Sequence, residues 1–209
     1  SDVQRLQRCF PLAKITIVYG STEAEPIATL NAIERISDLV KGEEMGLGAL
    51  VGQPVDDITV KVVDDELWVT GAHVNTHYFQ SPQADLENKI NDGEHIWHRT
   101  GDAAVIKGND IWLLGRVGES IHGNWPMPVE GTVLQLDFVK QAALVKYHGS
   151  AVLVLVCESL PSDWRTQVAR RTELPVILHE HIPLDPRHNT KIDRKRLSEL
   201  LAQSPQDIL

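Results

Sequence analysis

The chain has 209 residues, of which 42% are hydrophobic and 23% are charged, and this composition suits one globular domain or two small ones. Its formal net charge of -9 argues against broad nucleic-acid binding and against a polybasic membrane patch. Two cysteines, Cys9 and Cys157, are too few for a disulfide framework, no apolar run could span a bilayer, and the start shows no signal-peptide core. We therefore expect a cytoplasmic protein with no nucleic-acid partner and no transmembrane segment.

The beginning of the chain is predicted to hold a helix and a strand. Residues 3–10 carry apolar side chains close to helical spacing, which predicts a helix. The β-branched run at 13–19 predicts a strand that ends in a turn at Gly20. Residues 28–40 are compatible with a second helix, and a series of glycines then breaks the chain into loops.

The middle of the chain is predicted to be antiparallel β-structure. Strands at 58–63 and 66–70 are expected to pair across Asp64 and Asp65, as a hairpin that lacks the usual turn glycine. A short helix and two more strands follow, at 84–90, 97–106 and 111–114. We therefore predict an antiparallel sheet or a small β-barrel over residues 58–115.

After Gly118 the predicted strands alternate with helices. The strands are expected at 144–147, 151–157 and 176–179, and the helices at 161–171, capped by Ser162 or Asp163, and at 192–202. This alternation predicts a small α+β lobe. The expected fold class is therefore α+β, with a β-rich first domain over residues 1–117 and a second domain over residues 118–209.

Asp102 and Arg116 are the first candidate ligand-binding residues. Asp102 follows Gly101 in the segment 98–102, which reads His-Arg-Thr-Gly-Asp. A carboxylate there can accept two hydroxyl hydrogen bonds, as the 2′,3′-diol of a ribose would offer. Arg116 stands one predicted hairpin away and could reach the same sugar or a phosphate. The alternatives are an aspartate that only stabilises a turn and an arginine in a surface ion pair.

A second candidate group follows the first predicted strand. It consists of Tyr19, Gly20, Ser21, Thr22 and Glu23. A hydroxyl and a carboxylate in a turn suit contact with a phosphate and coordination of Mg²⁺, so Thr22 and Glu23 are candidates for catalysis. The ring of Tyr19 offers a flat face to a base. The alternatives are a helix or turn cap, a solvated charge and a core aromatic residue.

Lys191 is the third candidate and lies in a polar stretch before the last predicted helix. A lysine on a loop can deliver a point charge to a developing negative charge. The alternative is a solvated lysine beside Arg187, Arg194 and Lys195.

Nine histidines invite a metal interpretation. The pairs that are closest in sequence are His73 with His77, His95 with His98, and His179 with His181, the last two on one face of a predicted strand. None of these pairs has a completed ligand set or an accompanying cysteine pair. A metal site at these histidines is therefore disfavoured.

Four motifs in a fixed order are far more specific than any one of them. They lie at residues 19–23, 98–102, 115–116 and 187–194. Their order resembles the C-terminal part of the adenylate-forming superfamily, which includes acyl-CoA synthetases, peptide-synthetase adenylation domains and luciferases. The resemblance covers almost the whole chain.

This resemblance implies a reaction that joins a carboxylic acid to ATP and gives acyl-AMP and pyrophosphate, followed by rotation of a mobile C-terminal lobe. Residues 19–22 would meet the adenine and the α-phosphate, and Glu23 would bind Mg²⁺. Asp102 and Arg116 would hold the ribose. Lys191 would contact the carboxylate and the α-phosphate, where a positive charge and Mg²⁺ stabilise the pentacoordinate phosphorus.

Three departures from the family pattern stand out. The phosphate-gripping loop with its lysine is absent, together with most of the large N-terminal domain. Gly118 stands at a hinge position where Asp or Lys is usual. Residues 121–126 replace the usual Ile-Lys-x-x-Gly, and the pattern resumes at 128–130. We therefore expect this chain alone to be inactive and to require the missing N-terminal portion or a partner subunit.

The last motif, Arg-His-Asn-Thr-Lys-Ile at 187–192, resembles the branch that converts β-hydroxy acids to β-lactones in bacterial olefin biosynthesis. A fatty or β-hydroxy acid is thus the expected substrate, while CoA, a carrier-protein thiol and an internal hydroxyl all remain open as acyl acceptors. Two alternatives from other classes also remain. The chain could be a stand-alone half that binds a nucleotide or a partner without catalysis, or a plain structural domain.

Overall fold

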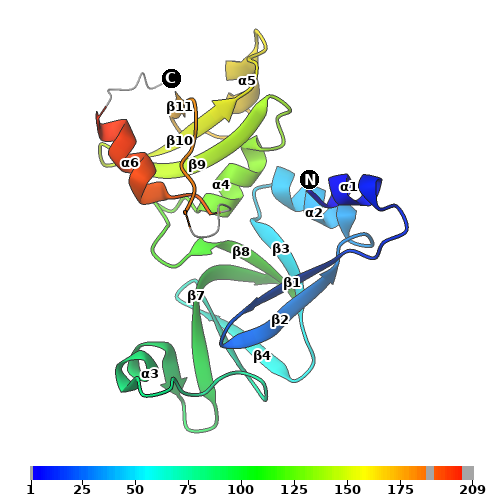
Figure 1. Ribbon diagram of the computed structural model, residues 1–209, viewed down its shortest axis with the longest axis vertical. Coiled ribbons are helices and arrows are strands. Elements are labelled where there is room, and N and C mark those ends of the chain that lie inside the picture. The colour runs from blue at the N-terminus through cyan, green and yellow to red at the C-terminus, as the bar shows by residue number, and fades with distance from the viewer. Residues whose placement is uncertain (1, 187–190, 204–209) are drawn as a thin grey trace. The chain divides into compact units, whose positions relative to one another are not determined.

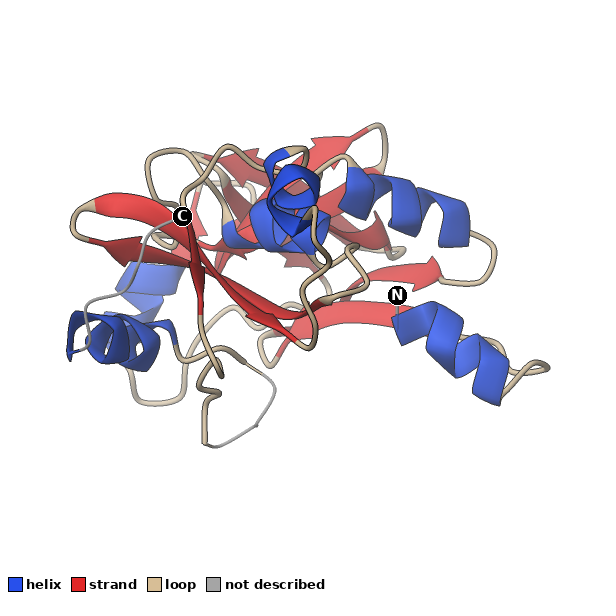
Figure 2. Cartoon of the chain, turned by 90° about the horizontal axis from the view of Figure 1, so that it is seen from above, coloured by secondary structure: helices blue, strands red, loops and turns tan. Residues whose placement is uncertain are grey.

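The computed structural model describes residues 2–186 and 191–203, and the chain divides into two compact units. The first unit comprises residues 1–42 and 47–118, and the second comprises residues 43–46 and 119–209. Within the described residues the helices are fewer than the strands (Figure 2). Within the described ranges, no helix is both long enough and apolar enough to cross a membrane.

The first unit is built on one antiparallel sheet. Among the described residues the strand order is β1-β2-β3-β8-β7-β5-β4, with β6 beside β7 (Figure 1). The strands are β1 Thr16–Ser21, β2 Ala24–Asn31, β3 Ala49–Pro54, β4 Ile58–Val63, β5 Glu66–Gly71, β6 Lys89–Asn91, β7 Ile96–Lys107 and β8 Asp110–Arg116. The helices in this part of the chain are α1 Asp2–Cys9, α2 Ile36–Glu44 and α3 Pro82–Asn88. The predicted antiparallel sheet over 58–115 is confirmed, and the sheet also takes in β1, β2 and β3.

The β4–β5 hairpin follows the prediction even though its turn has no glycine. Asp64 and Asp65 have φ values of 50° and 66°. A two-residue hairpin turn of type I′ requires positive φ at both central positions. Aspartate tolerates this left-handed region better than most residues because its short polar side chain can bond locally.

The helix predicted over residues 28–40 is confirmed only for residues 36–40, which belong to α2. Its first part belongs to β2, where Ala28 and Leu30 are buried and Thr29 is exposed, which is the period of a strand. The side chain of Asn31 then accepts hydrogen bonds from the N–H groups of Ile33 and Glu34 at 3.2 and 3.4 Å. This turn separates the strand from α2, so the helix starts only at residue 36.

The short helix predicted over 84–90 also begins earlier and ends sooner, as α3 at Pro82–Asn88. Pro82 suits the first turn because its missing N–H would have no partner there. Lys89 then enters β6, which the sequence did not predict, and lies opposite His98 of β7.

The core of the first unit is an apolar cluster formed by residues of its strands. Ile27, Leu67, Val69 and Ile111 are almost fully buried and belong to one apolar cluster. Burial of each such side chain contributes roughly 1.5–3 kcal/mol. The backbone of β2, β5 and β8 is therefore anchored by the packing of these side chains.

The second unit is a small sheet covered by helices on both faces. Within the described chain its strand order is β11-β10-β9, with β9 Val139–Tyr147, β10 Ser150–Cys157 and β11 Val176–Leu178. Its helices are α4 Pro126–Val133, α5 Trp164–Ala169 and α6 Arg194–Gln203. Leu153 and Leu155 of β10 pack with Val168 of α5, whereas Val152 and Val154 pack with α6. Burial of both faces explains the continuous apolar run in β10.

The second unit confirms the predicted α+β lobe with three corrections. The helix predicted at 161–171 is shorter, at Trp164–Ala169, and the Asp163 side chain before it makes no cap hydrogen bond. Helix α4 was not predicted, and Pro126 and Pro128 lie in its first turn, where proline is tolerated. The strand predicted at 144–147 starts five residues earlier, at Val139. The α+β fold class with its mostly antiparallel sheet is confirmed.

Candidate functional site

The β7–β8 hairpin places Asp102 opposite Arg116. The two residues are register partners, and Arg116 Nη1 donates to Asp102 Oδ1 at 2.7 Å. The same nitrogen donates to the carbonyl oxygen of Thr100 at 3.1 Å. The Arg116 side chain is 60% exposed and that of Asp102 is 19% exposed. The carboxylate is therefore held in a wall of the unit, while much of the guanidinium faces solvent.

Tyr19 reaches Asp102 from β1, 83 residues away in sequence. Its hydroxyl donates to Asp102 Oδ2 at 2.7 Å. Burial, and then the charge of Asp102, raise the pKa of Tyr19 far above its ordinary value, so the hydroxyl stays a donor. Both carboxylate oxygens thus accept a hydrogen bond within a three-residue cluster of Tyr19, Asp102 and Arg116, called the Asp102 cluster below.

The bend before Asp102 needs the glycine at position 101. Gly101 has a φ of 70°, and a Cβ there would come within 2.7 Å of Arg116 Nη2. Its N–H donates to Glu66 Oε1 at 3.0 Å, and the Thr100 hydroxyl donates to the carbonyl of Leu67 at 2.8 Å. Strand β5 therefore fixes the conformation of the Thr-Gly-Asp segment.

Glu66 is a structural partner that the sequence did not single out. It is only 5% exposed, and its Oε2 accepts from Arg99 Nε at 2.8 Å and from Trp68 Nε1 at 3.1 Å. As the first residue of a predicted strand it looked like any surface glutamate. No local pattern reveals that β7 turns its backbone N–H toward it.

The second cluster surrounds Glu23 in the turn between β1 and β2. Tyr78 donates its hydroxyl hydrogen to Glu23 Oε1 at 2.9 Å, and His98 Nε2 lies 3.9 Å from Glu23 Oε2. Burial alone would raise the pKa of Glu23, but hydrogen bonds from Tyr78 and from its own backbone outweigh burial and lower it. Glu23 is therefore ionised at neutral pH and holds oxygen lone pairs of the kind that Mg²⁺ prefers.

His98 and Lys89 stand behind this carboxylate. His98 is 3% exposed, and burial, then the positive charge of Lys89, lower its pKa, so it is neutral at pH 7. Lys89 Nζ lies 5.0 Å from the centre of the Tyr78 ring. The sequence named neither Tyr78 nor Lys89, because both depend on a loop and a strand whose position it did not predict.

The rest of the first candidate group shapes the turn. Gly20 leaves no room for a side chain, since a Cβ would come within 2.8 Å of the Ala24 carbonyl oxygen. A register shift lies between Tyr19 and Ser21, and Thr22 is exposed at the tip. The hydroxyl of Thr22 can therefore reach a ligand beside Glu23 without leaving the turn.

Lys191 lies in the second unit. Its side chain is exposed, and its carbonyl oxygen accepts from the N–H of Asp185 at 2.7 Å. Residues 187–190 of the same motif lie outside the described residues. The structure thus brings Tyr19, Asp102 and Arg116 together within the first unit, and Lys191 belongs to the second unit.

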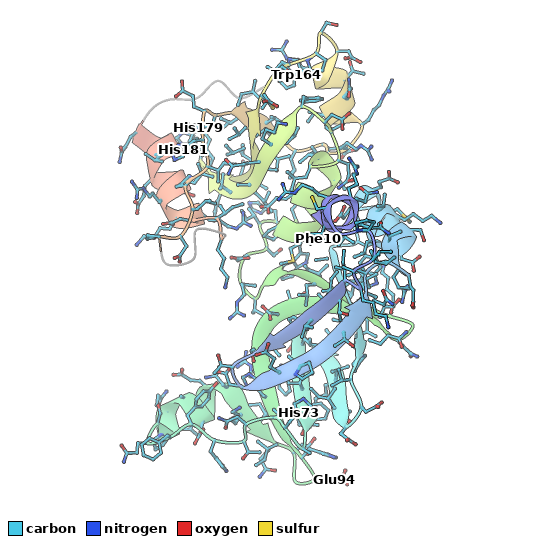
Figure 3. The ribbon with its side chains drawn as sticks, turned by 45° about the vertical axis from the view of Figure 1, so that its right-hand side comes forward. Phe10, His73, Glu94, Trp164, His179 and His181 are labelled. Carbon is cyan, nitrogen blue, oxygen red and sulfur yellow. The ribbon has the colours of Figure 1, made fainter. Side chains whose placement is uncertain are left out.

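In the part of the chain that the structure describes, the histidine pairs are not part of a potential metal site. Among the described residues, no group of three His, Cys, Asp or Glu side chains could hold a metal ion. His179 and His181 follow β11 and are not in it, and the His179 ring bonds the carbonyl of His181 at 2.7 Å (Figure 3). His73 bonds the carbonyl of Pro26 at 2.8 Å, and His77 lies 3.6 Å from Asp85.

The residues of the two clusters have the chemistry to bind a nucleoside phosphate and a cation. A carboxylate has about four lone-pair positions, so Asp102 can accept from a diol in addition to its present donors. The exposed guanidinium of Arg116 suits a sugar or phosphate oxygen. Glu23 offers an ionised oxygen to a hard cation.

Comparison with known proteins points to one superfamily. No family model matches the chain. The chain is 28% identical over 225 aligned positions to the olefin β-lactone synthetase of Stenotrophomonas maltophilia, an alignment that takes in 86% of this chain and 41% of that protein. It thus spans about two fifths of that relative, in its C-terminal part.

Solved structures show the same fold. The structure of IdnL7 superposes with a TM-score of 0.76 at 22% identity, over 97% of this chain and 42% of that one. McyG, solved with phenylalanyl-adenylate, gives 0.58 at 18% identity, over 96% of this chain and 36% of that one. Curated relatives and solved neighbours consistently point to adenylate-forming enzymes, which use ATP and form AMP adducts.

Proposed function

We propose that this chain is part of an AMP-forming carboxylic acid ligase, in which the Asp102 cluster binds the ribose and Lys191 is the mobile lysine. The observation that carries the proposal is the Tyr19–Asp102–Arg116 cluster, in which a fixed carboxylate stands between a tyrosine hydroxyl and an exposed guanidinium. In this proposal residues 1–117 end the large adenylation domain and residues 118–209 form the mobile C-terminal lobe.

Each candidate residue has a defined task in the proposed reaction. Asp102 accepts hydrogen bonds from the ribose hydroxyls, and Arg116 orients the same sugar. The ring of Tyr19 presents a face to the adenine. Thr22 donates to a phosphate oxygen, and Glu23 would hold Mg²⁺, which neutralises phosphate charge when bound.

Lys191 completes the proposed chemistry. Its ammonium stabilises the negative charge that develops when a carboxylate oxygen attacks the α-phosphorus and pyrophosphate leaves. A fatty or β-hydroxy acid is the proposed substrate, on the likeness to olefin β-lactone synthetase. The activated acyl group would pass to CoA, a carrier-protein thiol or its own hydroxyl. The chain also has two free cysteines, and we propose a cytoplasmic location on that ground.

The nucleotide part of the proposal is tested by calorimetric titration of the 209-residue chain with AMP. Asp102→Asn keeps the shape of the side chain and removes its charge. We expect roughly 10- to 100-fold weaker binding, because hydrogen bonds to a charged group contribute about 1.5–3 kcal/mol. Glu94→Gln, which neutralises an exposed carboxylate before β7, is the matched control. Equal affinity in wild type and Asp102→Asn would contradict the assignment.

The catalytic part is tested by acid-dependent ATP–pyrophosphate exchange in the whole protein that contains this chain. We expect Lys191→Ala to lower the exchange rate by about 100-fold or more, the scale of losing one charge-stabilising group. We expect no exchange by the 209-residue chain alone. If AMP binds but the whole protein shows no exchange with any fatty or β-hydroxy acid, the chain is a nucleotide-binding part without this activity.

A further inference from the structure

Lys191 lies in a short pair of backbone segments in the second unit. These segments are residues 183–185 and 191–193, called the stem below. Asp185 donates its N–H to the carbonyl oxygen of Lys191 at 2.7 Å, and Asp193 donates its N–H to the carbonyl oxygen of Pro183 at 2.9 Å. An isolated antiparallel bridge lies between these two bonds. The backbone of Lys191 is therefore fixed, although its side chain is exposed.

The stem leads directly into α6. Asp193 Oδ1 accepts from the N–H of Arg196 at 3.0 Å, which is the arrangement of a helix N-cap. Arg194, the first residue of α6, binds Glu130 of α4 through two nitrogens, with Nη1–Oε1 at 2.6 Å and Nη2–Oε2 at 3.2 Å. Its Nε also lies 3.9 Å from Glu119 Oε1. A bidentate ion pair thus connects the start of α6, and with it the stem, to α4.

The same ion pair completes an edge of the sheet. In the described strand order β9 has a neighbour on one side only, and its residue Leu144 is fully buried. The N–H of Leu144 donates to Glu130 Oε1 at 2.7 Å, and its carbonyl oxygen accepts from Arg194 Nη1 at 3.1 Å. Glu130 and Arg194 therefore take the place of a missing strand and connect α4, β9 and α6 at one point.

This arrangement is better suited to fixing a position than to adding stability. The side chains of Glu130 and Arg194 are 11% and 24% exposed, and burial raises the pKa of Glu130 although Arg194 opposes this. Buried ion pairs often add little stability compared with apolar residues of the same size, because both charges lose their water. Apolar side chains, however, could not bond both polar groups of Leu144.

We propose that Glu130 and Arg194 are positioning residues for Lys191. They fix the start of α6 and the stem before it, so that the backbone that carries the lysine ammonium has a defined position. This inference rests on the proposed function, in which Lys191 acts during acid adenylation. Neither residue touches the reacting groups in this proposal.

The test needs a variant that keeps the second unit folded. Arg194→Met alone leaves the Glu130 carboxylate buried without its partner and can unfold the unit. The double variant Glu130→Gln/Arg194→Met removes both charges and keeps an acceptor for the Leu144 N–H. Arg196→Met is the matched control, since Arg196 lies two residues further along α6 with an exposed side chain.

Backbone amide hydrogen exchange, measured by NMR on the 209-residue chain, reports the stem directly. In the double variant we expect the amides of Asp185 and Asp193 to exchange at least about tenfold faster, as in a local opening. The amide of Leu153, which bonds Pro175 within the sheet, should stay within about twofold of wild type. Unchanged stem amides, or equal acceleration at Leu153, would overturn the proposal, as would the same result in Arg196→Met.

The activity arm separates this inference from the proposed function. In the whole protein, the double variant should lower kcat of ATP–pyrophosphate exchange about tenfold and leave KM for ATP and acid within about twofold, as expected when only transition-state stabilisation is lost. If Lys191→Ala abolishes exchange while the double variant leaves kcat unchanged, the positioning role falls and the proposed function stands. If the whole protein shows no exchange at all, the proposed function falls and the amide data still decide whether the ion pair holds the stem.

Discussion

Two carboxylates, Asp102 in the first unit and Glu130 in the second, are both held by an arginine, but in opposite settings. Asp102 is paired with a guanidinium that is 60% exposed, and its partners Tyr19 and Arg116 are the groups proposed to meet a nucleotide. Glu130 is paired with Arg194 beside a buried strand edge, where no ligand is proposed. A ligand can replace hydrogen bonds of the exposed Asp102–Arg116 pair, whereas the buried Glu130–Arg194 pair only fixes the position of the backbone.

The largest expected effect comes from breaking the buried pair on one side. Arg194→Met should lower the free energy of unfolding by about 3–5 kcal/mol, because a buried carboxylate then loses its counter-ion. Urea denaturation followed by circular dichroism measures the loss. Arg196→Met should stay within about 0.5 kcal/mol of wild type, as is usual for exposed positions. A loss below about 1 kcal/mol in Arg194→Met would mean that water reaches the pair.

The exposed pair should respond in binding more than in stability. Gly101→Ala places a methyl group within 2.7 Å of Arg116 Nη2, so the guanidinium must move away from its present position. Gly108→Ala is a matched control, because its φ of 64° is similar to the 70° of Gly101 while no described atom beyond the adjacent residues lies within 4 Å of the added Cβ. Both should lose about 1–2 kcal/mol of stability through the left-handed backbone. Only Gly101→Ala should also weaken AMP binding in calorimetry, and equal affinities would contradict this view of the cluster.

The Glu23 cluster gives a pH-dependent version of the same comparison. The folded-state pKa of Glu23 lies below the ordinary 4.5, so its ionised form contributes stability above that pH, and this is lost as the pH falls through the folded pKa. Tyr78→Phe removes the main hydrogen bond that opposes burial, so the pKa of Glu23 should rise and the loss should begin at higher pH. A carboxyl ¹³C NMR titration of Glu23 measures the shift.

Tyr147→Phe, in the second unit, is the control for this titration and should leave the Glu23 curve unchanged. An unaltered curve in Tyr78→Phe would show that the tyrosine hydroxyl does not govern the carboxylate.

The smallest expected effect lies outside both arginine–carboxylate pairs. Asp65 has a φ of 66° in the β4–β5 turn, so Asp65→Gly should stabilise the chain by about 0.5–1 kcal/mol by removing left-handed strain. Asp56→Gly, at a position outside the left-handed region, should instead cost about 0.4–1 kcal/mol through added freedom of the unfolded chain. Thermal unfolding compares the two, and AMP binding should be unchanged in both. A lower melting temperature in Asp65→Gly would mean that the aspartate side chain itself stabilises the turn.

The sequence predicted the parts of the site that depend on short spacing. The sequence spacing between Asp102 and Arg116 predicted that they lie one hairpin apart, and the two residues are register partners. The hydrogen bond from Tyr19 to Asp102 could not be predicted from spacing, because it joins residues that are 83 positions apart in the sequence. Glu66 is similar, since only the packing of β5 against β7 turns it toward Gly101.

The errors in the fold have a common physical cause. Residues 28–31 have a sequence that suits either a helix or a strand, and pairing with β1 decides for the strand. Helix α4, which was not predicted, contains Pro126 and Pro128 and has a weak helix propensity, and its burial against the sheet stabilises it. Tertiary contacts that no local pattern carries decided both segments.

The ion pair at Leu144 has a further consequence for how the second unit meets other molecules. An edge strand with free N–H and C=O groups is a template on which a foreign strand can add, and this is a common start of aggregation. At Leu144 those two groups are already bonded to Glu130 and Arg194. A foreign strand could not continue its ladder past this residue without displacing two charged side chains, so β9 is protected against edge-to-edge association.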